Sequence, residues 1–175
     1  MKSLFTFLFL LITSGTFAQE RHAIPKEKWS KAFYISDEFC ATKGLKPGEA
    51  NDLLRVWNSY SNNGTMTRVV DIRLYFTSVP EANDYLDKNI ADLSEKGDTI
   101  NTKIEISMVS NLRIFRENAD IRRMNTSLGQ KNNMYYFIFT VKNYIAKVFV
   151  SGDMTLEEAA PFAKEAAKRL NAAVN

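Results

Sequence analysis

The sequence predicts an α+β domain, in which an antiparallel sheet of about four to five strands is covered on one face by helices and a helical segment lies at the N-terminus. Three observations predict this class. Apolar residues recur at steps of three and four in several segments, as in amphipathic helices. Other segments alternate apolar and polar residues, as half-buried strands do. The longest apolar segments are separated by short turns, which join antiparallel strands.

The first 18 residues have the pattern of a secretory signal peptide. Lys2 supplies a positive charge, residues 4–12 are apolar, and small residues lead up to Ala18. This order predicts cleavage between Ala18 and Gln19. The apolar run is about half of the roughly 20 residues that a membrane-spanning helix needs, and retention as an N-terminal anchor is the alternative. We therefore expect residues 19–175 to form a single periplasmic or secreted domain without a membrane span.

The N-terminal third is predicted to be helical. Residues 19–28 are polar, and we expect them to be mobile. Residues 29–40 carry apolar side chains at steps of three and four, which favours a helix, although their alternation also permits a strand. Residues 50–60 show a clearer helical stripe, which the Asn-Asn-Gly of residues 62–64 ends.

Strands and a further two helices are predicted in the rest of the chain. Ser78 and Glu81 have the spacing of a capping box, as do Thr155 and Glu158, and each pair predicts a helix start. The strand over residues 134–141 is apolar throughout, so we expect it to be central and buried on both faces. The predicted elements are a strand over 69–76, a helix over 79–96, extended chain over 104–115, strands over 134–141 and 144–150 joined by a two-residue turn, and a helix over 156–174.

Composition argues against several classes of function. A net charge of +3 is too small for a typical nucleic-acid-binding protein. Cys40 is the only cysteine, which rules out an intramolecular disulfide and favours a buried apolar role. The only histidine, His22, lies close to the predicted mature N-terminus, where a catalytic triad or a zinc site is difficult to assemble. The acidic pairs 37–38 and 157–158 indicate helix caps or solvated faces. We expect neither a metal nor a cofactor.

Residues 117–133 form the candidate site. They join two apolar strands and make a longer connection than most loops, which favours a functional role. Arginine binds carboxylates and phosphates through a rigid donor fork, so an anionic ligand or an acidic partner surface is expected here. The alternative is an irregular edge strand with solvated charges. The candidate binding residues are Arg113, Arg116, Arg122, Arg123 and Lys131, and the basic surface extends to Lys142, Asn143 and Lys147 if the hairpin lies beside them.

One stretch resembles a known family. The hairpin sequence MYYFIFTVKNYIAKVFVSG is followed by the alanine-rich helix TLEEAAPFAKEAAKRL, and a strand and a helix precede them. In this order of elements, residues 69–175 resemble secreted PsbP-like domains. The resemblance implies an α+β fold and a binding or assembly role, since such domains are mostly not enzymes. It assigns no functional residue, and the N-terminal third has no counterpart in it.

These observations lead to three hypotheses for the function. The first is a non-catalytic domain that binds an envelope protein or a small anionic ligand through residues 113–133. The second is a small metal-independent secreted hydrolase, which requires two carboxylates about 5 to 9.5 Å apart. The third is an inhibitor or immunity-type protein that blocks a secreted enzyme.

Overall fold

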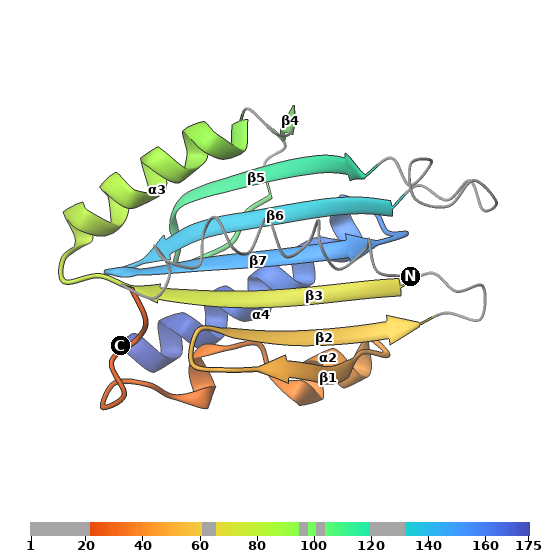
Figure 1. The fold of residues 1–175 in the computed structure, drawn as a ribbon, viewed down its shortest axis with the longest axis horizontal. Coiled ribbons are helices and arrows are strands. Elements are labelled where there is room, and N and C mark those ends of the chain that lie inside the picture. Colours follow the sequence, from red (N-terminus) through yellow and green to blue (C-terminus); the bar gives the residue numbers. More distant parts are fainter. Residues whose placement is uncertain (1–21, 61–65, 95–97, 101–103, 120–131) are drawn as a thin grey trace, which may run out of the picture.

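The computed structural model describes residues 22–60, 66–94, 98–100, 104–119 and 132–175. Within them lies a seven-stranded antiparallel sheet with the strand order β1-β2-β3-β7-β6-β5-β4 (Figure 1). The strands are β1 (Lys46–Ala50), β2 (Leu54–Tyr60), β3 (Met66–Tyr75), β4 (Asp98–Thr99), β5 (Ser110–Ala119), β6 (Asn132–Val141) and β7 (Tyr144–Gly152). The helices are the 3-10 turn η1 (Lys31–Phe33), α2 (Asp37–Thr42), α3 (Val79–Ser94) and α4 (Leu156–Val174). The predicted α+β class with an antiparallel sheet is confirmed.

The sheet is larger than the predicted four to five strands, in part because residues 50–60 are not a helix. They contribute β2, and β1 pairs with it at the edge of the sheet. β2 pairs with β3 along its whole length, from Leu54 opposite Ile72 to Tyr60 opposite Met66. This continuous pairing overrides the local helical stripe, because aromatic and β-branched side chains pack well on a pleated sheet.

The predicted helix over residues 29–40 is reduced to two short pieces, η1 and α2. The Ser30 hydroxyl accepts a hydrogen bond from the first turn of η1, and the Ser36 hydroxyl caps α2 in the same way. Extended residues separate the two pieces, and α2 contains only six residues. The N-terminal segment therefore contains two short capped helical pieces rather than a helical layer. We call residues 30–43 the N-terminal strap.

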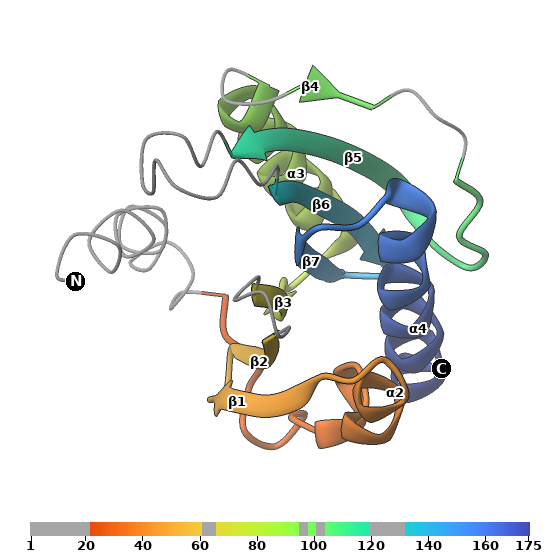
Figure 2. The same ribbon diagram turned by 90° about the vertical axis from the view of Figure 1, so that its right-hand side faces the viewer.

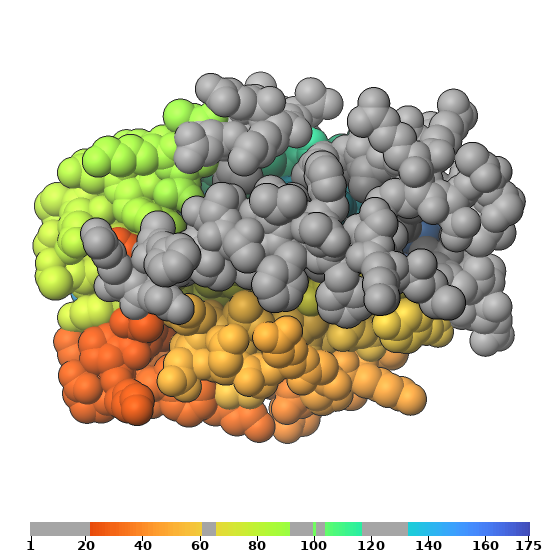
Figure 3. Space-filling view, in the orientation of Figure 1, coloured from red at the N-terminus to blue at the C-terminus, as the bar shows by residue number. Residues whose placement is uncertain are grey.

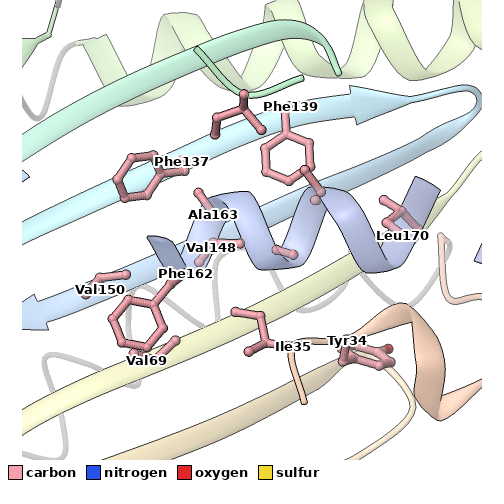
Figure 4. Close-up of a cluster of buried hydrophobic side chains, with 14 of the residues drawn as sticks. Tyr34, Ile35, Val69, Phe137, Phe139, Val148, Val150, Phe162, Ala163 and Leu170 are labelled. Atoms are coloured by element: carbon pink, nitrogen blue, oxygen red, sulfur yellow. The ribbon is translucent and has the colours of Figure 1, made fainter. Parts of the chain in front are cut away.

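One face of the sheet, the α4 face, carries η1, α2 and α4. Phe162, Ala163 and Leu170 of α4 are buried in the same cluster as Phe137 and Val148 of the central strands (Figure 4). The many alanines of α4 let the helix approach the sheet closely. This cluster is the larger of the two cores.

The opposite face carries α3, so the prediction that helices cover only one face is wrong. α3 buries Ala82 and Leu86 against Leu74, Ile138 and Ile145. Figure 2 shows α3 and α4 on opposite sides of the sheet, with α3 towards β5, β6 and β7. The physical reason is that β6 and β7 bury apolar side chains on both sides of the sheet, so that both faces need a cover. We call this second surface the α3 face.

The predicted strands of the C-terminal half are largely confirmed. Val141 pairs with Tyr144 across a two-residue turn, in which Lys142 adopts a positive φ of 53°. The extended chain predicted over residues 104–115 becomes a strand only at Ser110, where β5 begins. In the described part of the chain, no helix is both long enough and apolar enough to cross a membrane.

Both helix starts predicted from capping boxes are present. Thr155 and Glu158 form the complete reciprocal box at the start of α4. At α3 the Ser78 hydroxyl accepts from the Glu81 backbone N–H at 3.3 Å, but the Glu81 carboxylate bonds Thr77 instead of Ser78. α4 is therefore capped more completely than α3.

Candidate functional site

Of the five basic residues predicted to form the binding site, the structure describes two, and it places them apart. Arg122, Arg123 and Lys131 lie outside the described residues. Arg113 and Arg116 both belong to β5. They are three positions apart in an extended strand, so their side chains point to opposite faces of the sheet.

Arg113 and Arg116 therefore have different surroundings. Arg113 is exposed on the α3 face, opposite Ile138 of β6. Arg116 lies on the α4 face, where its Nη2 donates to Oδ1 of Asn133 at 2.9 Å. Lys142 donates to a backbone carbonyl at the end of α4 at 2.7 Å. The basic side chains that the structure describes do not form the single surface expected from the sequence.

Cys40 and the two acidic pairs, whose side-chain types can take part in catalysis, have structural roles in the fold. Cys40 is fully buried, and burial raises the pKa of its thiol to about 12, so it is a poor nucleophile. Both acidic pairs lie in the first turns of helices, as predicted, and Asp37 accepts a hydrogen bond from Nε1 of Trp57 at 2.8 Å. Across the described ranges, no three His, Cys, Asp or Glu side chains gather in a way that could hold a metal ion.

Asp71 and Arg73 of β3 form a fully buried ion pair on the α4 face. Nη1 of Arg73 bonds Oδ1 of Asp71, and Nη2 lies 3.0 Å from Oδ2. Asp71 also accepts from the backbone N–H of Ile35 at 2.8 Å, while Arg73 donates to the carbonyls of Phe33 at 3.1 Å and Ala166 at 3.4 Å. The pair thus joins the N-terminal strap and α4 to the sheet. Its polar atoms are occupied by protein partners, which makes it a structural element.

Lys147 of β7 is the buried charge of the α3 face. Only 6% of its surface is exposed, and its neighbours in the adjoining strands are Ile72 and Ile138. Its Nζ lies 3.0 Å from Oδ1 of Asn89 and 3.4 Å from the hydroxyl of Tyr85, and both groups are neutral. None of the ion pairs among the described residues includes Lys147. Burial lowers the pKa of Lys147 to about 8, because the ammonium loses its water without gaining a counter-charge.

α3 positions the two polar groups beside Lys147. Tyr85 and Asn89 are four residues apart, so they lie on the same side of the helix. The Asn89 amide nitrogen donates to the Tyr85 carbonyl at 3.1 Å, which turns its oxygen towards Lys147. The Lys147 ammonium also lies 5.0 Å from the centre of the Tyr85 ring, in a cation–π contact. Both α3 side chains are half-buried, so Lys147 lies just below the surface.

His22, which belongs to the segment 19–28 that the sequence predicts to be mobile, packs next to these residues, whereas residues 19–21 lie outside the described residues. Its ring stacks on Phe76 with 4.2 Å between centroids and meets the edge of the Tyr85 ring at 5.2 Å. Its carbonyl accepts from the backbone N–H of Tyr75 at 2.8 Å. His22 therefore packs against both Phe76 and Tyr85. We call these four residues the lysine cluster: Lys147, Tyr85, Asn89 and His22.

The strand register arranges the α3 face in two adjacent rows, each with one residue from each of five strands. The row that contains the lysine consists of Leu54, Ile72, Lys147, Ile138 and Arg113. The neighbouring row lies two residues away on every strand, in the same direction across the sheet. It consists of Val56, Val70, Phe149, Tyr136 and Phe115. We call them the lysine row and the apolar row. A buried cation thus adjoins a continuous apolar stripe.

The prediction that Lys147 extends a basic surface is wrong, because its side chain is buried on the α3 face. The sequence nevertheless contains a pattern that indicates the burial of Lys147. In the apolar run of residues 144–150, Lys147 shares its face with Ile145 and Phe149, so strand alternation places it on a buried face. The partners Tyr85 and Asn89 carried no such signal, because their contact with β7 depends on how α3 packs.

Comparison with known proteins found no matching family model, no similar curated protein and no similar solved structure. The function is therefore inferred from the geometry of the chain itself.

Proposed function

We propose that the chain is an exported, non-catalytic binding domain that takes a small anionic ligand on its α3 face, with Lys147 as the cation that meets the ligand's charge. One observation carries this proposal. Lys147 is an almost fully buried ammonium whose bonding partners are all neutral. Burying an unpaired charge destabilises a fold, and such groups concentrate at functional sites. An anion beside Nζ supplies the missing counter-charge.

The neighbouring groups fit binding better than catalysis. The Tyr85 hydroxyl and the Asn89 amide can donate or accept hydrogen bonds, but neither is charged. The pKa of Tyr85 is raised by burial, so this hydroxyl stays protonated at neutral pH and can donate to an anion. Neither hydrogen-bond partner of Lys147 is a carboxylate, so its surroundings give no support to the hydrolase alternative. The resemblance to PsbP-like domains favours the same non-catalytic role.

The edge of the sheet at β1 favours a small ligand over a partner protein that adds a strand. β1 contains Pro47, which has no N–H to donate, and its register with β2 shifts between Pro47 and Ala50. A short, irregular edge with a proline and the charged Lys46 and Glu49 discourages strand addition.

The test of this function is a titration with an anionic reporter, 8-anilinonaphthalene-1-sulfonate. For this test the full-length sequence is expressed in a bacterial host, and the protein is purified from the exported fraction. Its N-terminus is determined by intact-mass spectrometry, and we expect Gln19 as the first residue. We expect saturable fluorescence that Lys147→Met weakens about tenfold, the magnitude of one lost charged hydrogen bond. Lys142→Met is the matched control, because it removes the same charge from an exposed turn of the same hairpin. Equal binding by both variants would contradict the proposal.

A further inference from the structure

The apolar row indicates what kind of anion fits beside Lys147. Val70 and Phe149 are half-buried, and they lie next to Ile72 and Lys147 of the lysine row on β3 and β7. The rings of Tyr136 and Phe149 meet edge to face with 4.7 Å between centroids. Residues two apart on a strand are separated by about 6.6 Å, so the apolar row begins one side chain away from the ammonium. A ligand that contacts Lys147 is therefore close enough to contact this row as well. Only a ligand with an apolar body is stabilised by that second contact.

The two cations of the lysine row indicate a single negative charge on the group that bonds Lys147. Lys147 is a compact point charge, unlike the forked guanidinium that suits phosphate. The other cation of the lysine row is Arg113, which lies two strands away from Lys147, at a distance of about 10 Å between backbones. Arg113 is exposed and therefore hydrated. A dianion at Lys147 keeps one charge uncompensated in an apolar setting, which is unfavourable.

We propose that the ligand is a free aliphatic carboxylate, whose carboxylate group bonds Lys147 and the α3 polar groups and whose hydrocarbon chain lies over Val70 and Phe149, the half-buried members of the apolar row. This inference rests on the proposed function and deepens it. The carboxylate accepts from Nζ of Lys147 and from the Tyr85 hydroxyl, which are both donors. The chain displaces water from Val70 and Phe149, and each buried methylene contributes about 0.8 kcal/mol.

The ligand series that tests this class is decanoate, acetate and decanol, measured by isothermal titration calorimetry at pH 7 on the exported protein. We expect decanoate to bind at least about 100-fold more tightly than acetate because of its chain. We expect Lys147→Met to weaken decanoate about tenfold or more while leaving decanol unchanged. Val70→Asn, a change at a half-buried position, should weaken decanoate and leave acetate unchanged. Lys142→Met is the control and should behave like the wild type.

The outcomes separate the two proposals. If acetate and decanoate bind equally and both depend on Lys147, the anion-binding function stands and the aliphatic ligand class is wrong. If decanol binds as well as decanoate, and Lys147→Met changes neither, the anion-binding function is wrong as well. The same conclusion follows if none of the three ligands binds to protein that circular dichroism shows to be folded.

Discussion

The two faces of the sheet bury charge in opposite ways. On the α4 face, Asp71 and Arg73 are fully buried and bonded to each other and to four backbone groups. On the α3 face, Lys147 is buried almost as deeply but touches only neutral polar groups. Both arrangements rest on adjacent central strands, β3 and β7. The first is complete within the protein, whereas the second lacks its counter-charge.

This difference separates a structural role from a binding role. A buried ion pair with all of its hydrogen bonds made can hold elements in register, even if it adds little net stability. A buried ammonium with neutral partners has no such compensation, so its presence costs stability unless a ligand supplies the charge. The two faces therefore respond oppositely to the removal of a charge: the α4 face should lose stability and the α3 face should gain it.

The largest expected effect is on the α4 face. Asp71→Asn leaves the Arg73 guanidinium buried without its counter-charge, and we expect the free energy of unfolding to fall by about 3 to 5 kcal/mol in urea denaturation. The double variant Asp71→Leu/Arg73→Met, which removes both charges, should recover a large part of this loss. A single variant as stable as the wild type would contradict the structural role of the pair.

The next effect is on the α3 face and has the opposite sign. At pH 7, Lys147→Met should raise the free energy of unfolding by about 2 to 3 kcal/mol, because the lowered pKa measures the penalty for the buried ammonium. Lys142→Met should leave it within about 0.5 kcal/mol. A loss of stability in Lys147→Met, as expected for an ordinary structural lysine, would overturn the account of this face.

The pH dependence of that gain follows from the direction of the shift. Below about pH 8, Lys147 is protonated in both the folded and the unfolded chain, so the penalty is complete. Between about 8 and the ordinary value of 10.5, the unfolded chain holds more protons, so wild-type stability rises with pH relative to Lys147→Met. Tyr85, the titratable α3 group in contact with Lys147, stays neutral over most of this range because its pKa is raised. His22 lies in contact with the Tyr85 ring. Arg113, the other cation of the lysine row, remains charged over this whole pH range.

The smallest effect compares the caps of the two covering helices. Thr155→Ala and Ser78→Ala each remove one hydroxyl that accepts a backbone N–H at 3.3 Å, and each should lower the free energy of unfolding by about 1 kcal/mol. In native-state hydrogen exchange, the amides of α3 should exchange faster than those of α4, because α3 packs on the smaller cluster. Equal protection of both helices would argue against a more weakly held α3.

The sequence predicted the elements whose signal is local. The strands at residues 69–76 and 134–150, the turn at Lys142 and the capping box at Thr155 all follow from alternation, turn length or side-chain spacing. The errors concern long-range contacts. Residues 50–60 carry a helical stripe but pair with β3, and a second helical cover on the α3 face is decided by packing rather than by any one segment.

The site was harder to predict for the same reason. Arg113 and Arg116 are close in sequence, but the pleat of β5 sends them to opposite faces. Lys147 lies 58 residues from Asn89 and 62 from Tyr85 in the sequence, so their proximity depends on the docking of α3. Arg113 is the predicted binding residue that the structure places on the same face as Lys147.

The central claim is that Lys147 is buried without a counter-charge and receives one from a carboxylate ligand. The most direct measurement is an NMR titration of the Lys147 side-chain ammonium against pH, on protein without ligand and on protein saturated with decanoate. We predict a pKa of about 8 without ligand and a clear upward shift towards the ordinary lysine value when decanoate is bound. A pKa near 10.5 in the ligand-free protein, or a low pKa that decanoate leaves unchanged, would contradict this claim.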